Sequence, residues 1–130
     1  MNKYLQAKGR LRYGEMNKTE AEFAALLRKF KREGRIEDFW FEAVSFKIAE
    51  NKCRYTPDFL VLLRDMSLVV FEVKGSLRVF QDDAKVKCKV FSDKYPLRLY
   101  IVAPRPKKAG AGWECLSYTD EQPPINLNQQ

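Results

Sequence analysis

Two carboxylates and a lysine stand within the most apolar part of this chain. Asp58 comes directly before the apolar run 59–63, and Glu72 and Lys74 interrupt the end of a second run, 68–75. Consecutive residues of a β-strand point to opposite faces, so Glu72 and Lys74 are expected on one face and Val73 on the other. Strands that are apolar on both faces belong at the centre of a covered sheet. The three charges are therefore predicted to lie where water is scarce.

The turn between the two runs decides whether Asp58 meets Glu72. A three-residue loop at residues 64–66 makes the numbers of paired residues sum to 130, which places Asp58 directly opposite Glu72. Their side chains would then lie about 5 Å apart on one face of the hairpin. A loop with an even number of residues would separate them unless a β-bulge corrected the register.

Two neighbouring buried carboxylates are costly unless a cation neutralises them. Carboxylate oxygens without histidine or thiolate favour Mg²⁺ or Mn²⁺ over zinc. A divalent metal site is one interpretation of Asp58 and Glu72. The structural alternative is a buried ion pair of Lys74 with Glu72 or with Asp58 at the edge of the sheet.

The composition excludes several kinds of chemistry. The 130 residues include no histidine, which removes Ser-His-Asp and Cys-His catalysis and every zinc site that uses imidazole. The cysteines are far apart, without a CxxC pair, and are predicted to be small core residues: Cys53, Cys88 and Cys115. The N-terminal stretch is basic and polar, with no apolar leader, so a cytoplasmic location is expected.

The net charge of +7, from 24 Lys and Arg against 17 Asp and Glu, is unevenly distributed. Residues 1–35 carry +6, residues 36–75 carry −2 and residues 76–130 carry +3. Basic segments on either side of an acidic middle favour a polyanionic partner, most often nucleic acid. The alternative is a set of ordinary solvated lysines.

The first helix is predicted to begin at Thr19, which fits a capping box with Glu22, and to end at Gly34. Apolar residues recur at helical spacing between them. Glu20 lies only about 20° from Leu27 on a helical wheel, at the edge of the apolar stripe, so its carboxylate is expected to face the body of the domain. It could equally be a first-turn acid favoured by the helix dipole.

An α/β domain with a mixed central sheet flanked by helices is expected. Residues 36–48 and 97–103 are predicted strands, residues 81–95 a second helix, residues 104–112 a basic loop and residues 113–118 an edge strand. The strand after the second helix is expected to run parallel to the one before it.

Some basic residues are expected to contact an anion. Lys87 falls inside the apolar arc of the second helix, where it either snorkels to water or reaches an anion, whereas Lys85 and Lys89 fall on the polar side. We expect a basic N-terminal arm over residues 1–15, a folded domain over residues 16–118 and a flexible C-terminal tail over residues 119–130. The arm and the loop supply further candidates for nucleic-acid binding, Lys8, Arg10, Arg12, Lys107 and Lys108.

The pairs Pro57-Asp58 and Glu72-Val73-Lys74, with Glu20 in a preceding helix, resemble the PD-(D/E)xK nuclease superfamily. The resemblance covers residues 17–103 and lies in the order of the elements and the interval between the two motifs. Asn17-Lys18-Thr19-Glu20-Ala21 and the lysine-rich second helix resemble small phage nucleases of the endonuclease I and Holliday-junction resolvase type. The implied fold is a restriction-endonuclease-like core of a helix, three strands, a helix and a strand.

This resemblance also implies roles for individual residues. Asp58, Glu72 and the main-chain carbonyl of Val73 would hold one or two Mg²⁺ or Mn²⁺ ions, and Lys74 would position and activate water. Glu20, or Glu22 in its place, would complete the metal site. Lys87 would contact a phosphate or steady the site, with Lys85 and Lys89 as competitors for that role.

The function implied is a metal-dependent endodeoxyribonuclease that acts on branched or junction DNA in phage-type recombination or replication. The alternatives are a non-catalytic nucleic-acid-binding module and the nuclease subunit of a larger recombination or transposition complex. Junction cleavage takes two coordinated cuts and would call for a homodimer. Trp40 and Phe41 could serve such an interface or belong to the core.

Overall fold

The computed structural model describes residues 14–78, 82–119 and 122–128. Lys8, Arg10 and Arg12 of the expected basic arm lie outside the described residues. None of the helices that the described residues form has both the length and the apolar character needed to span a membrane.

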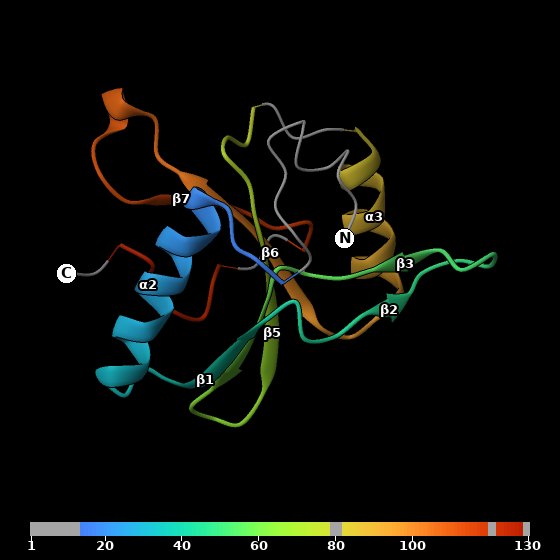
Figure 1. Cartoon of the computed structure of the whole chain (residues 1–130), viewed down its shortest axis with the longest axis horizontal. Coiled ribbons are helices and arrows are strands. Elements are labelled where there is room, and N and C mark those ends of the chain that lie inside the picture. The colour runs from blue at the N-terminus through green and yellow to red at the C-terminus, as the bar shows by residue number, and fades with distance from the viewer. Residues whose placement is uncertain (1–13, 79–81, 120–121, 129–130) are drawn as a thin grey trace.

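A mixed five-stranded sheet with one helix on each face forms the body of the molecule (Figure 1). The spatial order is β1-β4-β5-β6-β7, with β5 and β6 parallel and every other neighbouring pair antiparallel. The strands are β1 (Ile36–Phe41), β4 (Phe59–Leu63), β5 (Leu68–Val73), β6 (Arg98–Pro104) and β7 (Trp113–Leu116). The expected α/β class, mixed sheet and edge strand are confirmed.

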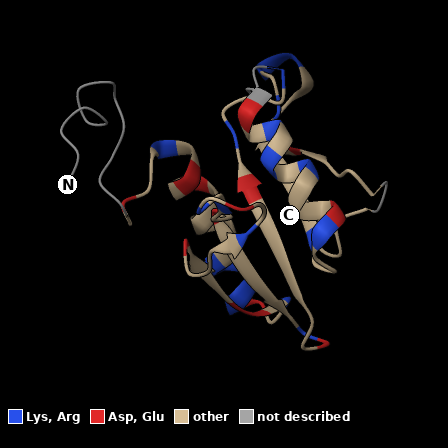
Figure 2. Ribbon diagram, turned by 90° about the vertical axis from the view of Figure 1, so that its right-hand side faces the viewer, with Lys and Arg blue, Asp and Glu red and all other residues tan. Residues whose placement is uncertain are grey.

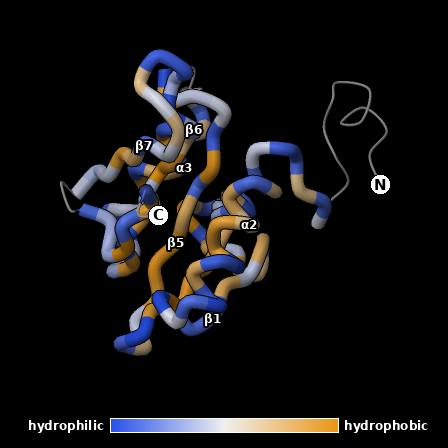
Figure 3. Tube along the Cα trace, turned by 90° about the vertical axis from the view of Figure 1, so that its left-hand side faces the viewer, coloured by the Kyte–Doolittle hydropathy of each residue, from blue (hydrophilic) through white to orange (hydrophobic). Residues whose placement is uncertain are grey.

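Each face of the sheet carries its own hydrophobic core. Helix α2 (Lys18–Arg32) packs Phe23 and Leu27 on one face, and helix α3 (Asp82–Lys94) packs Cys88 and Phe91 on the other. Successive residues of β5 alternate between the two cores, so the strand is buried on both faces, as expected. Figure 3 shows the apolar residues concentrated in the central strands and the hydrophilic ones at the connecting loops.

The N-cap of helix α2 lies two residues earlier than predicted. Asn17, not Thr19, is the N-cap: its side chain accepts a hydrogen bond from the Glu20 N–H, and the Glu20 carboxylate accepts one from the Asn17 N–H, each 2.8 Å long. This capping box satisfies two N–H groups that the first turn leaves without helical partners. Glu22 therefore has no part in the cap.

The single strand expected over residues 36–48 is wrong. Strand β1 ends at Phe41, and Glu42 takes a left-handed conformation with φ of 48° that turns the chain out of the sheet. The chain then forms a separate hairpin of β2 (Phe46–Lys47) and β3 (Arg54–Tyr55), which packs against α3 rather than α2. Alternating apolar residues continue through the break, which is why periodicity alone did not reveal it.

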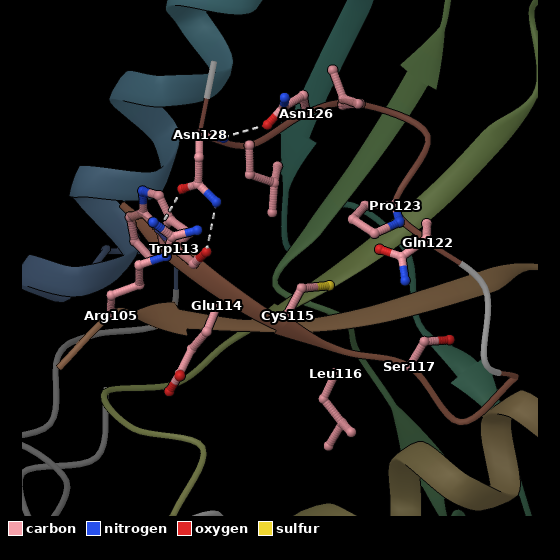
Figure 4. A pocket seen from close by; sticks show the side chains of 12 residues that line it. Arg105, Trp113, Glu114, Cys115, Leu116, Ser117, Gln122, Pro123, Asn126 and Asn128 are labelled. Atoms are coloured by element: carbon pink, nitrogen blue, oxygen red, sulfur yellow. Dashed lines mark hydrogen bonds between the residues drawn. The ribbon is translucent and has the colours of Figure 1, made fainter. Parts of the chain in front are cut away.

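Residues 122–128 pack against the sheet, so this described part of the tail expected over residues 119–130 belongs to the fold. Ile125 and Leu127 are buried in the α2-side core, and the side chain of Asn128 hydrogen-bonds both the N–H and the C=O of Trp113 at 2.7 and 3.0 Å. Figure 4 shows this segment running beside β7, with a pocket between them. Because β7 is an edge strand, the outward N–H and C=O of Trp113 have no strand partner, and the amide side chain of Asn128 supplies both an acceptor and a donor for them.

Candidate functional site

The hairpin of β4 and β5 has the register that brings Asp58 to Glu72. Residues pair from Phe59 with Phe71 to Leu62 with Leu68, and the Leu63 N–H donates to the Ser67 carbonyl across a loop of residues 64–66. One further step along the same register sets Asp58 opposite Glu72. Of the two loop lengths considered from the sequence, the structure has the three-residue loop, the one that brings the two carboxylates together.

Pro57 ends the ladder at the site. In an antiparallel ladder, hydrogen-bonded pairs recur at every second position. The series that starts at residues 63 and 67 passes through 61 and 69, then 59 and 71, and would continue at Pro57 and Val73. Proline has no N–H to donate to the Val73 carbonyl. The Val73 N–H donates instead to the Asp58 carboxylate at 2.8 Å. The chain thus frees a carbonyl beside two acidic side chains.

Glu72 is the one charged residue that is buried among the described residues, with 8% of its surface exposed. Its two oxygens have different partners: Oε1 accepts a hydrogen bond from the Tyr55 hydroxyl at 2.6 Å, and Oε2 lies 3.2 Å from the Lys74 ammonium. The buried ion pair of Lys74 and Glu72, considered above as the structural alternative to a metal site, is therefore present in the structure.

The two carboxyl groups of the site, of Asp58 and Glu72, both have raised pKa values although Lys74 lies beside them. Burial, followed by the charge of Glu72, raises the pKa of Asp58 to about 9, against the effect of the Val73 N–H. Burial also raises the pKa of Glu72, although Lys74 and Tyr55 oppose it. Burial acts to lower the pKa of Lys74, but the charge and the hydrogen bond of Glu72, with smaller contributions from Asp58 and Cys88, together raise it. Lys74 is thus a cation at neutral pH, whereas Asp58 holds a proton.

Glu20 lies on the same side of the molecule as this pair. Its negative charge contributes to the raised pKa of both Asp58 and Glu72, so it is within electrostatic range of them. Glu22 is exposed and lines the groove between α2 and the loop that follows β6. Of the two glutamates proposed from the sequence, Glu20 is therefore the one that the helix directs to the site, where its carboxylate also forms the N-terminal cap.

Glu42 is a site residue that the sequence reasoning missed. Its N–H donates to the Asp58 carbonyl at 2.8 Å, and burial, together with the charges of Glu20 and Glu72, raises the pKa of its carboxyl group. It was missed because it lies inside the predicted strand 36–48, and the left-handed turn that brings it beside Asp58 leaves no periodic signal. Tyr55 was also missed, and the one signal available was its place three residues before Asp58.

Lys87 does not lie where the helical wheel placed it. It is exposed, whereas Lys85 is half-buried, because the buried side of α3 centres on Cys88 and Phe91 and turns away from Lys87. The helical wheel placed Lys87 between Phe91 and Val90, but of these three only Phe91 is fully buried, and Val90 is half-buried at the edge of the packed side. Any contact of Lys87 with an anion would be at the surface and not inside the site.

A basic groove begins at the same edge of the sheet. The Lys74 N–H donates to the Val102 carbonyl at 2.8 Å, and β6 ends two residues later at Pro104, where the loop with the short helix η1 (Lys107–Ala109) starts. Between this loop and α2 lies the groove that Glu22 lines, and its lining also includes three cations and an aromatic residue: Lys29, Arg105, Lys107 and Trp113. Figure 2 shows Lys and Arg residues at the tip of this loop and along α3.

The donor atoms fit a hard divalent cation in chemical type. Asp58 and Glu72 supply carboxylate oxygens, and Val73 supplies a carbonyl that Pro57 leaves without its ladder donor. Within the described residues, no three acidic or thiol side chains stand close enough together to hold a metal ion in the present conformation. Thiol ligation is disfavoured, since burial raises the pKa of Cys88 to about 12.

Comparisons with family models, with curated proteins and with solved structures find no match for this chain. The structure itself shows an α/β fold with a mixed five-stranded sheet and a helix on each face. Membership of the PD-(D/E)xK superfamily is therefore a proposal, carried by the residues of the site.

Proposed function

We propose that this protein is a divalent-metal-dependent endodeoxyribonuclease that hydrolyses DNA phosphodiester bonds. Its proposed active-site residues are Asp58, Glu72 and Lys74. The observation that carries the proposal is the hairpin register, which sets two carboxylates opposite each other with a lysine on the same side. A basic groove begins at the same sheet edge, where a phosphate backbone could approach.

The residues that would hold Mg²⁺ or Mn²⁺ are Asp58, Glu72 and the carbonyl of Val73, with Glu20 as a further carboxylate nearby. The ion, when bound, would neutralise the scissile phosphate and lower the pKa of the attacking water. Its charge would also let Asp58 and Glu72 be ionised together, which burial and mutual repulsion oppose in the metal-free protein.

Lys74 is proposed to orient the attacking water and to add positive charge beside the phosphate. Because the Glu72 carboxylate raises its pKa, Lys74 keeps its proton at neutral pH and acts as a hydrogen-bond donor and a cation rather than as a base. Metal binding by the carboxylates and orientation of water by Lys74 need no imidazole, which agrees with a chain that contains no histidine.

The basic groove and the basic arm are proposed to bind the DNA backbone. Arg105 and Lys107 line the groove and Lys108 is exposed beside it. The arm residues Lys8, Arg10 and Arg12 and the exposed Lys87 would add phosphate contacts, which position a duplex without reading its sequence. We also propose branched or junction DNA as the substrate and a homodimer as the acting form.

Cleavage assays test this proposal directly. Purified protein with Mg²⁺ or Mn²⁺ should nick or cut one or more of four substrates: a four-way junction, a flap, a single strand and a linear duplex. Asp58→Asn and Lys74→Ala should abolish cutting and leave DNA binding largely intact. Asp65→Asn is the matched control, because Asp65 is an exposed acid at the opposite end of the same hairpin. Undiminished cutting by both site variants would refute the assignment.

A second candidate function is a nucleic-acid-binding module without catalysis. The observation that favours it is the ion pair between Lys74 and Glu72, which satisfies the buried carboxylate without a metal ion. This alternative predicts that the wild-type protein binds DNA with the salt dependence of a basic surface but cuts none of the four substrates in either metal. A nuclease subunit of a larger assembly would instead cut once its partner proteins were added.

A further inference from the structure

We infer that Tyr55 is a positioning residue of the proposed metal site, which holds the Glu72 carboxylate in the orientation that metal binding requires. The inference rests on the proposed function and extends it to a residue outside the motifs. Tyr55 belongs to the β2–β3 hairpin, which is separate from the main sheet.

The contact is short and buried. The Tyr55 hydroxyl donates to Glu72 Oε1 at 2.6 Å, and both residues are buried. Lys74 approaches the other oxygen, Oε2, at 3.2 Å. Two donors on opposite oxygens fix the plane of the carboxylate, and loss of one would leave a buried oxygen unpaired and let the group rotate toward the remaining donor.

The direction of the Tyr55 hydroxyl is also fixed. The thiol of Cys88, on α3, donates to the Tyr55 oxygen at 3.8 Å, so the hydroxyl proton is left to point at Glu72. The ring of Tyr55 packs against Phe91 with centroids 5.3 Å apart. The hydroxyl is thus held by α3 and acts on a strand of the main sheet.

The hairpin is built to hold Tyr55 in place. Its tip is a tight turn in which Asn51 and Lys52 both have φ near 60° and the Cys53 N–H donates to the Glu50 carbonyl, the geometry of a two-residue type I′ turn. At its base, Phe46 pairs with Tyr55 and packs on Phe91. Three residues after Tyr55 the same chain supplies Asp58, so one rigid segment positions one carboxylate and orients the other.

An outer hydrogen bond of this kind changes metal affinity without touching the metal. Partners that orient a ligating carboxylate typically contribute a factor of about 10–100 to affinity. Tyr55→Phe removes the hydroxyl and keeps the ring. We expect it to weaken Mn²⁺ binding to the full-length, DNA-free protein by about 10-fold or more, measured by the electron paramagnetic resonance signal of free Mn²⁺. The Mn²⁺ concentration for half-maximal cutting should rise by a similar factor, with the rate recovered at saturating metal.

Tyr95→Phe is the matched control. The Tyr95 hydroxyl donates to the Lys47 carbonyl at 2.6 Å and fastens the same hairpin to the same helix, but it does not touch Glu72. It should cost comparable stability and leave Mn²⁺ affinity unchanged. Circular dichroism of both variants verifies that they fold. In a Glu72→Gln background, Tyr55→Phe should have no further effect on Mn²⁺ binding.

The outcomes separate this inference from the proposed function. Equal Mn²⁺ affinity of Tyr55→Phe, Tyr95→Phe and the wild type overturns the role of Tyr55 while the nuclease proposal stands. A wild-type protein that neither binds Mn²⁺ nor cuts DNA overturns both. A selective loss of Mn²⁺ binding in Tyr55→Phe supports the inference even if no tested DNA is cut.

Discussion

At the scale of single residues, the site is a pair of neighbouring carboxyl groups that are largely removed from water, and Lys74 forms an ion pair with one of them. Lys74 contacts Glu72, whereas Asp58 has the Val73 N–H and holds a proton because burial and its neighbour raise its pKa to about 9. A metal-free protein with this arrangement has a carboxyl group that is protonated in the folded state and ionised in the unfolded state at neutral pH. Linkage turns that difference into a pH dependence of stability.

The first prediction concerns Asp58 in the metal-free protein. Below about pH 4 both states are protonated, and between the unfolded pKa near 3.8 and the folded pKa of about 9 the folded state binds more protons, so stability should fall as the pH rises through this range. Asp58→Asn cannot ionise and should escape this fall. At pH 8, in EDTA, its free energy of unfolding should exceed that of the wild type by about 1 kcal/mol or more, a rise in Tm of about 4 °C.

Thermal unfolding from pH 5 to 9 measures this difference. Adding Mg²⁺ or Mn²⁺ at pH 8 should restore the wild-type stability and leave Asp58→Asn unaffected, since the variant has lost a ligand. The prediction is wrong if both proteins lose stability with pH to the same extent.

At the scale of elements, the β4–β5 hairpin could be predicted from the sequence and its surroundings could not. The two apolar runs and the polar turn between them predict the hairpin, and a three-residue turn is the condition under which its register sets Asp58 opposite Glu72, as the structure shows. The runs are apolar on both faces, so burial alone does not select the register. The break at Glu42 and the burial order of α3 depend on contacts between distant elements, which periodicity does not contain. The β2–β3 hairpin, and with it Tyr55, was missed for the same reason.

The second prediction concerns the turn that sets this register. Met66 has a φ of 71° and is 67% exposed. Its left-handed backbone conformation is therefore unfavourable, and its exposed side chain contributes little packing to offset that. Met66→Gly should relieve that cost and stabilise the protein by about 0.5–1 kcal/mol in urea unfolding. Met66→Ala keeps the strain and should give no gain. DNA cutting should be unchanged in both, because the turn lies at the opposite end of the hairpin from Asp58.

At the scale of the whole molecule, residues 122–128 complete the core on the α2 side, and the basic η1 loop follows the end of β6, at the edge of the sheet that carries the site. The pattern expected for a frayed tail, polar and proline-containing, hid two apolar residues at alternate positions, Ile125 and Leu127, which both reach the core. The Asn126 carbonyl between them accepts a hydrogen bond from Arg35 at 2.7 Å. The C-terminal segment is therefore part of the folded unit.

The third prediction tests that closure. Leu127 is 4% exposed, so Leu127→Ala should destabilise the protein by about 2–4 kcal/mol through lost burial and the cavity left behind. Pro124→Ala, at an exposed position of the same segment, should change stability by less than about 0.5 kcal/mol. Urea unfolding measures both. Equal, small effects of the two substitutions would show that the segment contributes little to the core.

The fourth prediction concerns the charged edge. If the η1 loop contacts the DNA backbone, Lys107→Ala combined with Lys108→Ala removes up to two phosphate contacts and should lower the slope of log affinity against log salt by up to about 2. Arg64, in the β4–β5 turn at the opposite end of the sheet, supplies the control: Arg64→Ala should leave the slope unchanged. Binding is best measured with the Asp58→Asn protein, which should hold DNA without cutting it. A slope that falls equally for the loop and the turn would mean that DNA is attracted by net charge alone, whereas a fall confined to the loop shows that the phosphate backbone contacts the η1 loop, which follows the end of β6 at the same edge of the sheet as Lys74.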